Sequence, residues 1–197
     1  YVAMALDAGA DGVLVPYCET VDEVRHCAVK LRTHPLKGEY YERVVDTGEY
    51  PSDKSKKYLA ERHKDHIFIM GIESEPAANR VGELIDCADI DGVFIGPNDM
   101  STSLGIPDES SNPIYLDTLS RIIAEADKRG LPTMIHQQTI ETSAKAIELG
   151  ARFIMHSSDA GILLRGTQEE FAELRKITSK KYGVVDEVEA EDTLDVV

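Results

Sequence analysis

Short apolar runs alternate with amphipathic stretches along most of the chain. The runs are rich in β-branched and aromatic residues and are continuously apolar, which is typical of strands buried on both faces. They cover residues 12–16, 67–72, 92–96, 132–135 and 152–155. Helical patterns lie between or after them, at 21–32, 76–87, 114–129, 139–149 and 168–180. Regular alternation of strand and helix predicts an α/β fold with a parallel sheet and right-handed crossovers.

One helix–strand unit recurs within the chain. Residues 5–15 are echoed by 146–155 and, more loosely, by 85–95. In the first two copies a helix ends at a glycine suited to a left-handed cap and a strand follows at once. Such repetition is expected of a (β/α)8 TIM barrel, although an open doubly wound sheet would also show it.

The length of the chain bears on how much of a barrel it holds. A complete (β/α)8 barrel needs about 250 residues, whereas this chain has 197 residues and starts with a helical pattern, 1–8, that begins in mid-element. We therefore expect a TIM barrel that lacks its first strands. Residues 1–181 are predicted to form this partial barrel as one domain.

Residues 182–197 are predicted to form a disordered acidic tail. The net charge of the chain is −15, and the stretch 186–197 contributes six acidic residues and no basic one, which leaves −9 for the rest. The stretch has no helical stripe and no aromatic residue. A segment of this composition cannot bury enough apolar surface to fold.

Charge and composition exclude several classes of partner. An excess of 36 acidic over 21 basic residues argues against nucleic acid and against an anionic membrane surface. No apolar run approaches the length of about 18 residues that a membrane span needs. The three cysteines, Cys18, Cys27 and Cys87, form no C-x-x-C pair, so we expect reduced thiols in a cytoplasmic protein.

The stretch 32–64 is the least regular part of the chain. It contains two Gly- and Pro-bearing segments and one charged helical pattern at 55–63. Long structured excursions are often functional loops. We expect this one to follow a strand and to lie on the active-site side of the barrel.

Two acidic residues stand where buried strands end. Glu73 follows the run 67–72, and Asp99 follows the run 92–96. Because the carboxyl ends of barrel strands face the catalytic mouth, adjacent strands would bring the two carboxylates together. Two oxygen ligands suit Mg²⁺ or Mn²⁺ better than zinc. The alternative is local: Glu73 could merely precede a helix capped by Ser74, and Asp99 could close an Asx-turn.

The residues between the third strand and Asp99 form a second candidate. Gly96, Pro97, Asn98 and Asp99 read as a tight turn whose backbone N–H groups could form an anion-binding nest for a substrate carboxylate. Most Gly-Pro turns, however, are only turns.

Three further residues are ambiguous. His136 and His156 are expected to end the fourth and fifth strands and could point into the mouth, although structural histidines are commoner than catalytic ones. Arg165 could bind an anion or form a surface salt bridge.

Two stretches of the chain resemble a known family. Residues 72–74, Ile-Glu-Ser, and 91–105, Asp-Gly-Val-Phe-Ile-Gly-Pro-Asn-Asp-Met-Ser-Thr-Ser-Leu-Gly, closely resemble the HpcH/HpaI aldolases. These are metal-dependent class II pyruvate aldolases related to citrate lyase β-chain-like proteins. The stretches 8–16 and 146–155 fit in the same order, so the resemblance extends from residue 1 to about 180.

The resemblance implies an activity and a site. It implies a carbon–carbon lyase, an aldolase or retro-aldolase, that acts on 2-keto acids such as 4-hydroxy-2-oxo acids or 2-keto-3-deoxy sugar acids, with pyruvate as product or nucleophile. It makes Glu73 and Asp99 the ligands of Mg²⁺ or Mn²⁺ and assigns the pyruvate carboxylate to the backbone amides around Asn98 and Asp99. It also implies a homo-oligomer with sites near subunit interfaces, and a catalytic base that precedes Tyr1.

The chain departs from the family pattern at two places. Gly71 stands where the family has Gln, and 37–43 replace its Gly/Arg-rich loop. These changes keep two rivals open. One is another pyruvate- or acyl-CoA-type lyase on the same barrel. The other is a non-catalytic paralogue or fragment that binds a metal–keto acid complex or assembles with active subunits.

Overall fold

The computed structural model describes residues 1–183, which divide into one compact unit of residues 1–155 and a second that begins at His156. The strands are β1 (Gly12–Val15), β2 (Ile67–Ile72), β3 (Gly92–Ile95), β4 (Thr133–Gln137) and β5 (Phe153–His156). The helices of the first unit are α1 (Val2–Asp7), α2 (Val21–Thr33), α3 (Gly38–Thr47), α4 (Asp53–His63), α5 (Glu75–Asn79), α6 (Val81–Asp86), α7 (Pro97–Ser103), α8 (Pro113–Asp127) and α9 (Ile140–Glu148).

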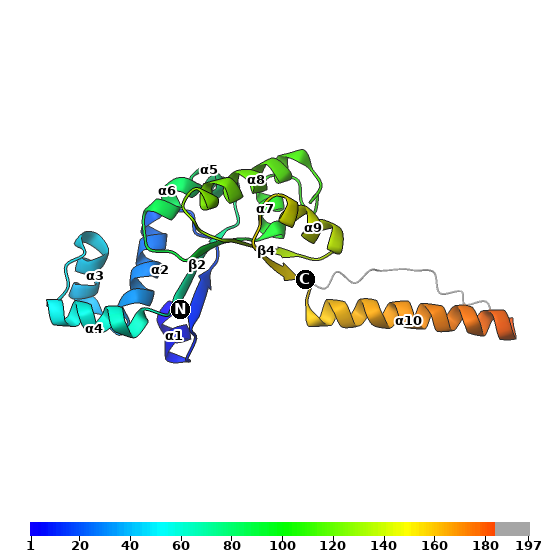
Figure 1. The fold of residues 1–197 in the computed structure, drawn as a ribbon, viewed down its shortest axis with the longest axis horizontal. Coiled ribbons are helices and arrows are strands. Elements are labelled where there is room, and N and C mark those ends of the chain that lie inside the picture. Colours follow the sequence, from blue (N-terminus) through cyan, green and yellow to red (C-terminus); the bar gives the residue numbers. More distant parts are fainter. Residues whose placement is uncertain (184–197) are drawn as a thin grey trace. The chain divides into compact units, whose positions relative to one another are not determined.

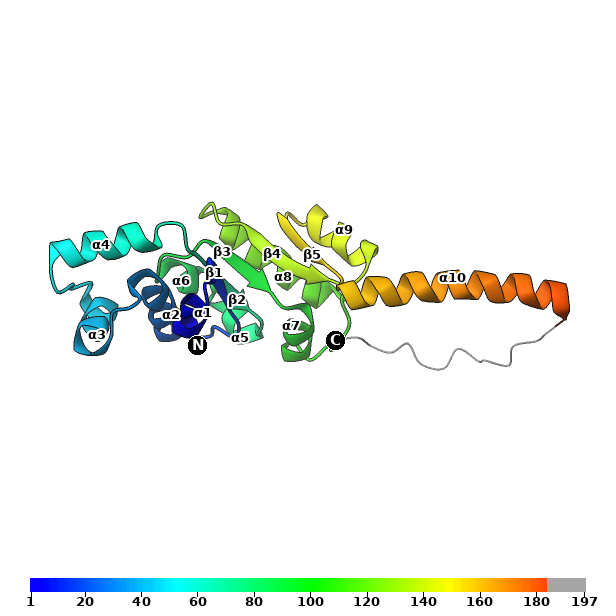
Figure 2. The same ribbon diagram turned by 90° about the horizontal axis from the view of Figure 1, so that it is seen from below.

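All five predicted strands form one sheet. The strand order is β1-β2-β3-β4-β5, so each strand lies beside its neighbour in the chain (Figure 2). The pairs from β1 to β4 are parallel, and the register places Val15 opposite Met70 and Ile72 opposite Ile95. This confirms the predicted α/β fold with a parallel sheet.

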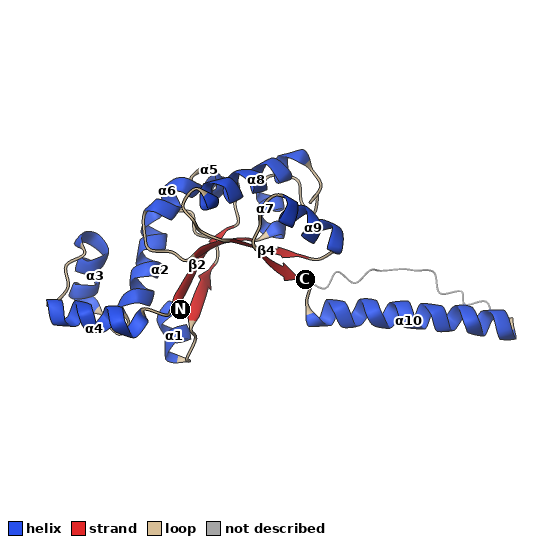
Figure 3. Cartoon of the chain, viewed as in Figure 1, coloured by secondary structure: helices blue, strands red, loops and turns tan. Residues whose placement is uncertain are grey.

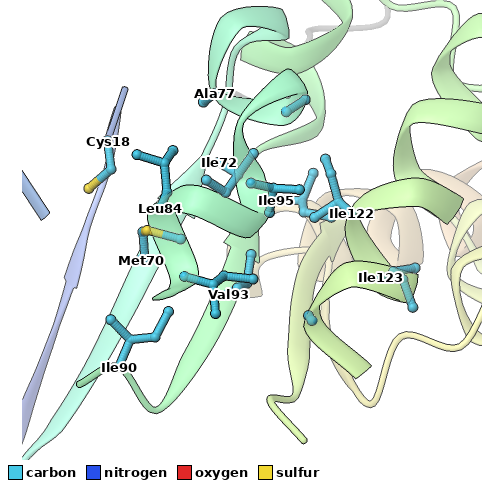
Figure 4. Packing of buried hydrophobic residues seen from close by; sticks show 14 of the residues in the cluster. Cys18, Met70, Ile72, Ala77, Leu84, Ile90, Val93, Ile95, Ile122 and Ile123 are labelled. Atoms are coloured by element: carbon cyan, nitrogen blue, oxygen red, sulfur yellow. The ribbon is translucent and has the colours of Figure 1, made fainter. Parts of the chain in front are cut away.

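Helices cover one face of this sheet (Figures 1 and 3). Alternate strand residues such as Met70, Ile72, Val93 and Ile95 point into a core filled by side chains of α2, α5, α6 and α8 (Figure 4). A doubly wound sheet has helices on both faces and reverses its strand order. Sequential order with helices on one face of this unit is the arrangement of a barrel wall instead.

The intervening strand residues explain why the runs are continuously apolar. Ile69, Phe94 and Met134 are only partly buried, and Leu14 is 38% exposed. They belong to the face of the sheet opposite the helices described above. A barrel wall presents apolar side chains to both its helices and its interior, so both sets are hydrophobic.

Helix boundaries differ from the predictions at three places. The predicted helix 76–87 is two helices, because Arg80 leaves helical geometry (φ −116°, ψ 12°) between α5 and α6. The helix α3 was not predicted, since Gly38 and the neighbouring Pro35 suggested an irregular loop. The turn at 96–99 is the start of α7, with Gly96 as its N-cap and Pro97 in the first turn. Proline is well suited to that position.

The excursion at 32–64 lies at the opposite end of the sheet from the one expected. It follows the helix α2 rather than a strand, and it leads into the start of β2. The backbone N–H of Ile67 donates to the carbonyl of Asp11, which marks the amino ends of the first two strands. The prediction that this excursion borders the catalytic mouth is therefore wrong.

The second unit contains α10 (Asp159–Tyr182), which is longer than the predicted 168–180 because Ser158 caps it at its start. Gly183 ends it in the left-handed conformation. Most of the predicted acidic tail, residues 184–197, lies outside the described residues. No helix within residues 1–183 is both long and apolar enough to cross a membrane.

Candidate functional site

The ends of β2 and β3 bring the two predicted carboxylates into one region. Glu73 follows β2 directly and is buried, with 6% of its surface exposed. Asp99 follows β3 by one helical turn and is exposed. Because Ile72 and Ile95 are register partners, these residues leave the sheet side by side. Both side chains are therefore displayed at the carboxyl edge.

Tyr17 joins the two carboxylates, and sequence reasoning missed it. Its backbone N–H donates to Oε2 of Glu73 at 2.8 Å, and its hydroxyl donates to Oδ1 of Asp99 at 2.8 Å. Tyr17 lies just past the end of β1 and has a φ of 54°, so the chain turns sharply there. The available signal was its position, since residues after β1 reach the same edge as those after β2 and β3.

Within residues 1–183, Glu73, Asp99 and Tyr17 bring two carboxylates together without a neighbouring positive charge. Burial raises the pKa of Glu73, the Tyr17 amide opposes this, and the charge of Asp99 raises it further. The hydrogen bond to Asp99 raises the pKa of Tyr17, so its hydroxyl remains a donor. Among the described residues, neither carboxylate has a Lys, Arg or His nitrogen within 4.0 Å. Two neighbouring carboxylates without a countercharge favour a bound cation.

Two glycines make room for this arrangement. A Cβ on Gly96 would lie 2.6 Å from Oε1 of Glu73, so any larger residue would displace that carboxylate. A Cβ on Gly71 would lie 2.9 Å from both Cα of Pro16 and the carbonyl oxygen of Val15. Position 71 therefore has no room for a side chain. The turn that carries Tyr17 occupies the space of a side chain there.

The predicted nest at Gly96, Pro97, Asn98 and Asp99 takes a different form from a tight turn. These residues are the N-cap and first turn of α7. The first turn of a helix leaves backbone N–H groups without helical carbonyl partners. The local alternative for Glu73 is also present, since Ser74 caps α5 by accepting from the N–H of Ala77. Capping by Ser74 and a ligand role for Glu73 are compatible, because different side chains serve them.

The other predicted candidates belong to later elements of the chain. His136 is in β4 and half-buried, and His156 is the last residue of β5. Arg165 lies on α10 and donates to the hydroxyl of Ser157 at 3.0 Å. Cys18 follows Tyr17 but is buried, and burial raises the pKa of its thiol to about 12. Its thiolate is therefore not a nucleophile near neutral pH.

The donor set fits a hard divalent cation. Within residues 1–183 no group of three or more His, Cys, Asp and Glu side chains could hold a metal ion, so a closed zinc-type site is absent from that part of the chain. The pair Glu73 and Asp99 supplies two carboxylates only. Mg²⁺ is commonly bound by one or two carboxylates, with water and substrate oxygens as its other ligands.

Comparisons with known proteins show which family the chain resembles. A model of the HpcH/HpaI aldolase/citrate lyase family matches residues 1–165. The chain is 29% identical over 167 residues to 5-keto-4-deoxy-D-glucarate aldolase from Salmonella arizonae, covering 83% of this chain and 63% of that protein. It is 30% identical over 167 residues to 2-keto-3-deoxy-L-rhamnonate aldolase from Shigella sonnei, covering 79% of this chain and 61% of that protein. The chain thus spans somewhat less than two thirds of the length of these curated relatives.

Solved structures show the same fold. A HpcH/HpaI aldolase/citrate lyase family protein from Burkholderia cenocepacia superposes with a TM-score of 0.73 at 27% identity, over 88% of this chain and 68% of that one. An HpcH/HpaI aldolase from Desulfitobacterium hafniense superposes with a TM-score of 0.71 at 21% identity, over 89% of this chain and 68% of that one.

Proposed function

The chain belongs to the HpcH/HpaI aldolase/citrate lyase family, and on this basis we propose that it is part of a divalent-metal-dependent aldolase that cleaves or forms a carbon–carbon bond in 2-keto acids. The family match confirms the resemblance that the sequence suggested. Two curated relatives are aldolases of keto-deoxy sugar acids. We propose the same class of substrate here, together with 4-hydroxy-2-oxo acids, and pyruvate as the common product.

One observation carries the proposal. Glu73 accepts a hydrogen bond from the backbone N–H of Tyr17, and Asp99 accepts one from the hydroxyl of the same residue. Neither carboxylate has a basic side chain within 4.0 Å in the described residues. A bound Mg²⁺ or Mn²⁺ would act as a Lewis acid toward the keto group of the substrate and so favour breakage of the neighbouring carbon–carbon bond. The two carboxylates are the residues that would hold it.

The other parts of the site have separate roles in this proposal. The N–H groups of Asn98 and Asp99, in the first turn of α7, would bind the substrate carboxylate, with Gly96 and Pro97 setting the path of the chain. Tyr17 would position the two carboxylates through its amide and hydroxyl. In the cleavage direction the bond between C3 and C4 breaks, the 4-hydroxyl loses its proton, and the electron pair passes to C3, which is then protonated to give pyruvate.

The remaining predictions stay proposals. We propose that the sheet is part of a (β/α)8 barrel whose other strands, including the one that carries the catalytic base, precede Tyr1. We also propose a cytoplasmic homo-oligomer. The half-exposed apolar face formed by residues such as Leu14 and Phe94 supports the barrel, because barrel interiors are packed by such side chains.

The decisive experiment is an assay of pyruvate release from a 4-hydroxy-2-oxo acid by the full-length gene product, with and without Mg²⁺ or Mn²⁺. We expect release that requires the ion and that is lost on chelation. A folded, ion-loaded protein that releases no pyruvate from a 4-hydroxy-2-oxo acid or from a 2-keto-3-deoxy sugar acid would contradict the aldolase. It would leave the non-catalytic paralogue or a different lyase as the better hypothesis, and an assay with acyl-CoA esters would separate these two.

A further inference from the structure

A cavity lies at the end of the sheet opposite Glu73 and Asp99. It has a volume of about 670 Å³ and is lined by α2, α3 and α4 and by the turn at 87–91. Its lining includes His63 and Lys64, which precede β2, and Asp91, which precedes β3. It therefore belongs to the amino ends of the strands. The helices α3 and α4 belong to the excursion at 32–64, and Figure 1 shows them beside α2.

The two acidic residues of the cavity are already paired. Arg32 donates from Nη2 to Oδ2 of Asp91 at 2.7 Å and places Nε 3.3 Å from Oδ2 of Asp89. The same oxygen of Asp91 also accepts from the N–H of Phe68 at 2.7 Å. Arg32 therefore offsets one of the two negative charges, and the group of Arg32, Asp89 and Asp91 keeps a net charge of −1.

The other charged residues of the lining are basic. Lys64 pairs with Glu61 at 2.7 Å, but Arg25 and Lys56 have no carboxylate oxygen within 4.0 Å in residues 1–183. The nearest polar contact recorded for Arg25 is a 3.4 Å hydrogen bond to the carbonyl of Cys87. Arg25 and Lys56 outweigh the single negative charge left on the group of Arg32, Asp89 and Asp91, so the lining is positive in a chain of net charge −15.

The rest of the wall is apolar. It consists of one tyrosine ring, which lies near Lys56, and several aliphatic side chains. These residues are Ala28, Val29, Val44, Val45, Tyr50, Ala60 and Ala88. At the base His63 is 3% exposed, and its Nδ1 has no hydrogen-bond partner. Concave sites of about 300–1,000 Å³ with apolar walls and a few polar groups are typical of small-molecule binding.

We propose that this cavity binds a small organic anion, a carboxylate or phosphate attached to an apolar body. Arg25 and Lys56 would bind the anionic head, and the aliphatic wall with Tyr50 would pack against the body. The cavity shares no lining residue with the carboxylate pair, so the inference does not depend on the aldolase. A ligand there would occupy a site distinct from the substrate's.

Isothermal titration calorimetry on the full chain tests this with three related probes. These are 1-naphthoate, 1-naphthyl phosphate and the neutral 1-naphthol. We expect at least one anion to bind, and naphthol to bind roughly tenfold more weakly because it lacks the charge-assisted hydrogen bonds. The first two probes distinguish a carboxylate from a phosphate ligand.

Matched variants locate the binding. Arg25→Gln and Lys56→Gln should each weaken the anion roughly tenfold, the loss of one charge-assisted contact. Lys57→Gln, one residue further along α4 and outside the cavity lining, should leave it unchanged. All three positions are exposed, and circular dichroism verifies that each variant folds. Three results would overturn the proposal: no anion binding by the folded wild type, equal binding of naphthol, or equal losses in Lys56→Gln and Lys57→Gln.

Discussion

The two ends of the parallel sheet are built in opposite ways. At the carboxyl end the strands pass into Tyr17, Glu73 and Asp99 through connections of a few residues, and two carboxylates meet without a basic side chain nearby. At the amino end a long excursion after α2 lines a cavity whose two acids pair with Arg32. Short connections fix the positions of side chains at one end, whereas the longer excursion builds a pocket at the other.

The charged residues at the two ends of the sheet differ in burial and therefore in the ligands that they suit. Glu73 is buried and its pKa is raised, so its charge is costly unless a cation compensates it. Arg25 and Lys56 are exposed and carry their charge at little cost. The carboxyl end therefore suits a tightly held ion, and the amino end suits exchangeable anions.

Removal of one carboxylate should have the largest effect. Glu73→Gln or Asp99→Asn should weaken Mn²⁺ binding by about a hundredfold or more. Loss of a residue that only hydrogen-bonds a metal ligand costs about 10–100-fold, and loss of a ligand itself should cost at least as much. Asp89→Asn, at the other end of the sheet, should leave it unchanged because Asp89 is exposed and pairs with Arg32. Calorimetric titration with Mn²⁺ measures this. Unchanged affinity in both Glu73→Gln and Asp99→Asn would remove the metal assignment.

A methyl group at Gly71 should give the next largest effect. Gly71→Ala places a Cβ against the backbone of Val15 and Pro16, so overpacking should lower the free energy of unfolding by about 2–3 kcal/mol. Gly48→Ala meets no atom within 4 Å but has a φ of +73°, so it should cost about 1 kcal/mol. Urea denaturation compares them. Equal losses would show that the turn at Tyr17 moves freely.

Loss of the Tyr17 hydroxyl should have a smaller effect. Tyr17→Phe removes the hydrogen bond that orients Asp99 and should weaken Mn²⁺ binding by about tenfold, the low end for an outer-shell partner. Tyr58→Phe is a matched control, because Tyr58 is 57% exposed and Tyr17 is 59% exposed. If both variants bind Mn²⁺ like the wild type, Tyr17 does not position the ligand.

The pH dependence of stability should show the smallest effect, and it concerns the amino end. Burial lowers the pKa of His63, the hydrogen bond to the backbone carbonyl of His34 opposes this, and the charges of His66, Arg62 and His34 lower the pKa further. The unfolded chain then binds a proton near its ordinary pKa of about 6.5 that the folded chain does not bind. Stability should therefore fall as the pH drops below about 6.5, by at most about 1.4 kcal/mol per pH unit from this group.

His63→Gln isolates this contribution. The difference in unfolding free energy between wild type and variant, measured by urea denaturation from pH 8 to pH 5, should narrow as the pH falls. If the difference stays constant over this range, His63 is protonated equally in the folded and in the unfolded chain.

Part of the site could be predicted from local sequence, and part depends on contacts between distant residues. Glu73 and Asp99 were predictable because Glu73 directly follows a buried apolar run, Asp99 lies within one helical turn of another, and parallel strands end at one edge. Tyr17 was not, because its role depends on a φ of 54° and on contacts 56 and 82 residues away along the chain. The helical start at Gly96 was missed because Gly-Pro is common both in turns and at the first turn of a helix.

The α/β class, the five strands and the residues at their ends could be read from the sequence, because a run of apolar residues is a local property of the chain. The folded chain was needed to show that the excursion after α2 lies at the amino end, that the turn at Tyr17 fills the space beside Gly71, and that Arg25 and Lys56 line one cavity. These features depend on which distant segments occupy the same volume, and a local pattern of apolar residues carries no information about that.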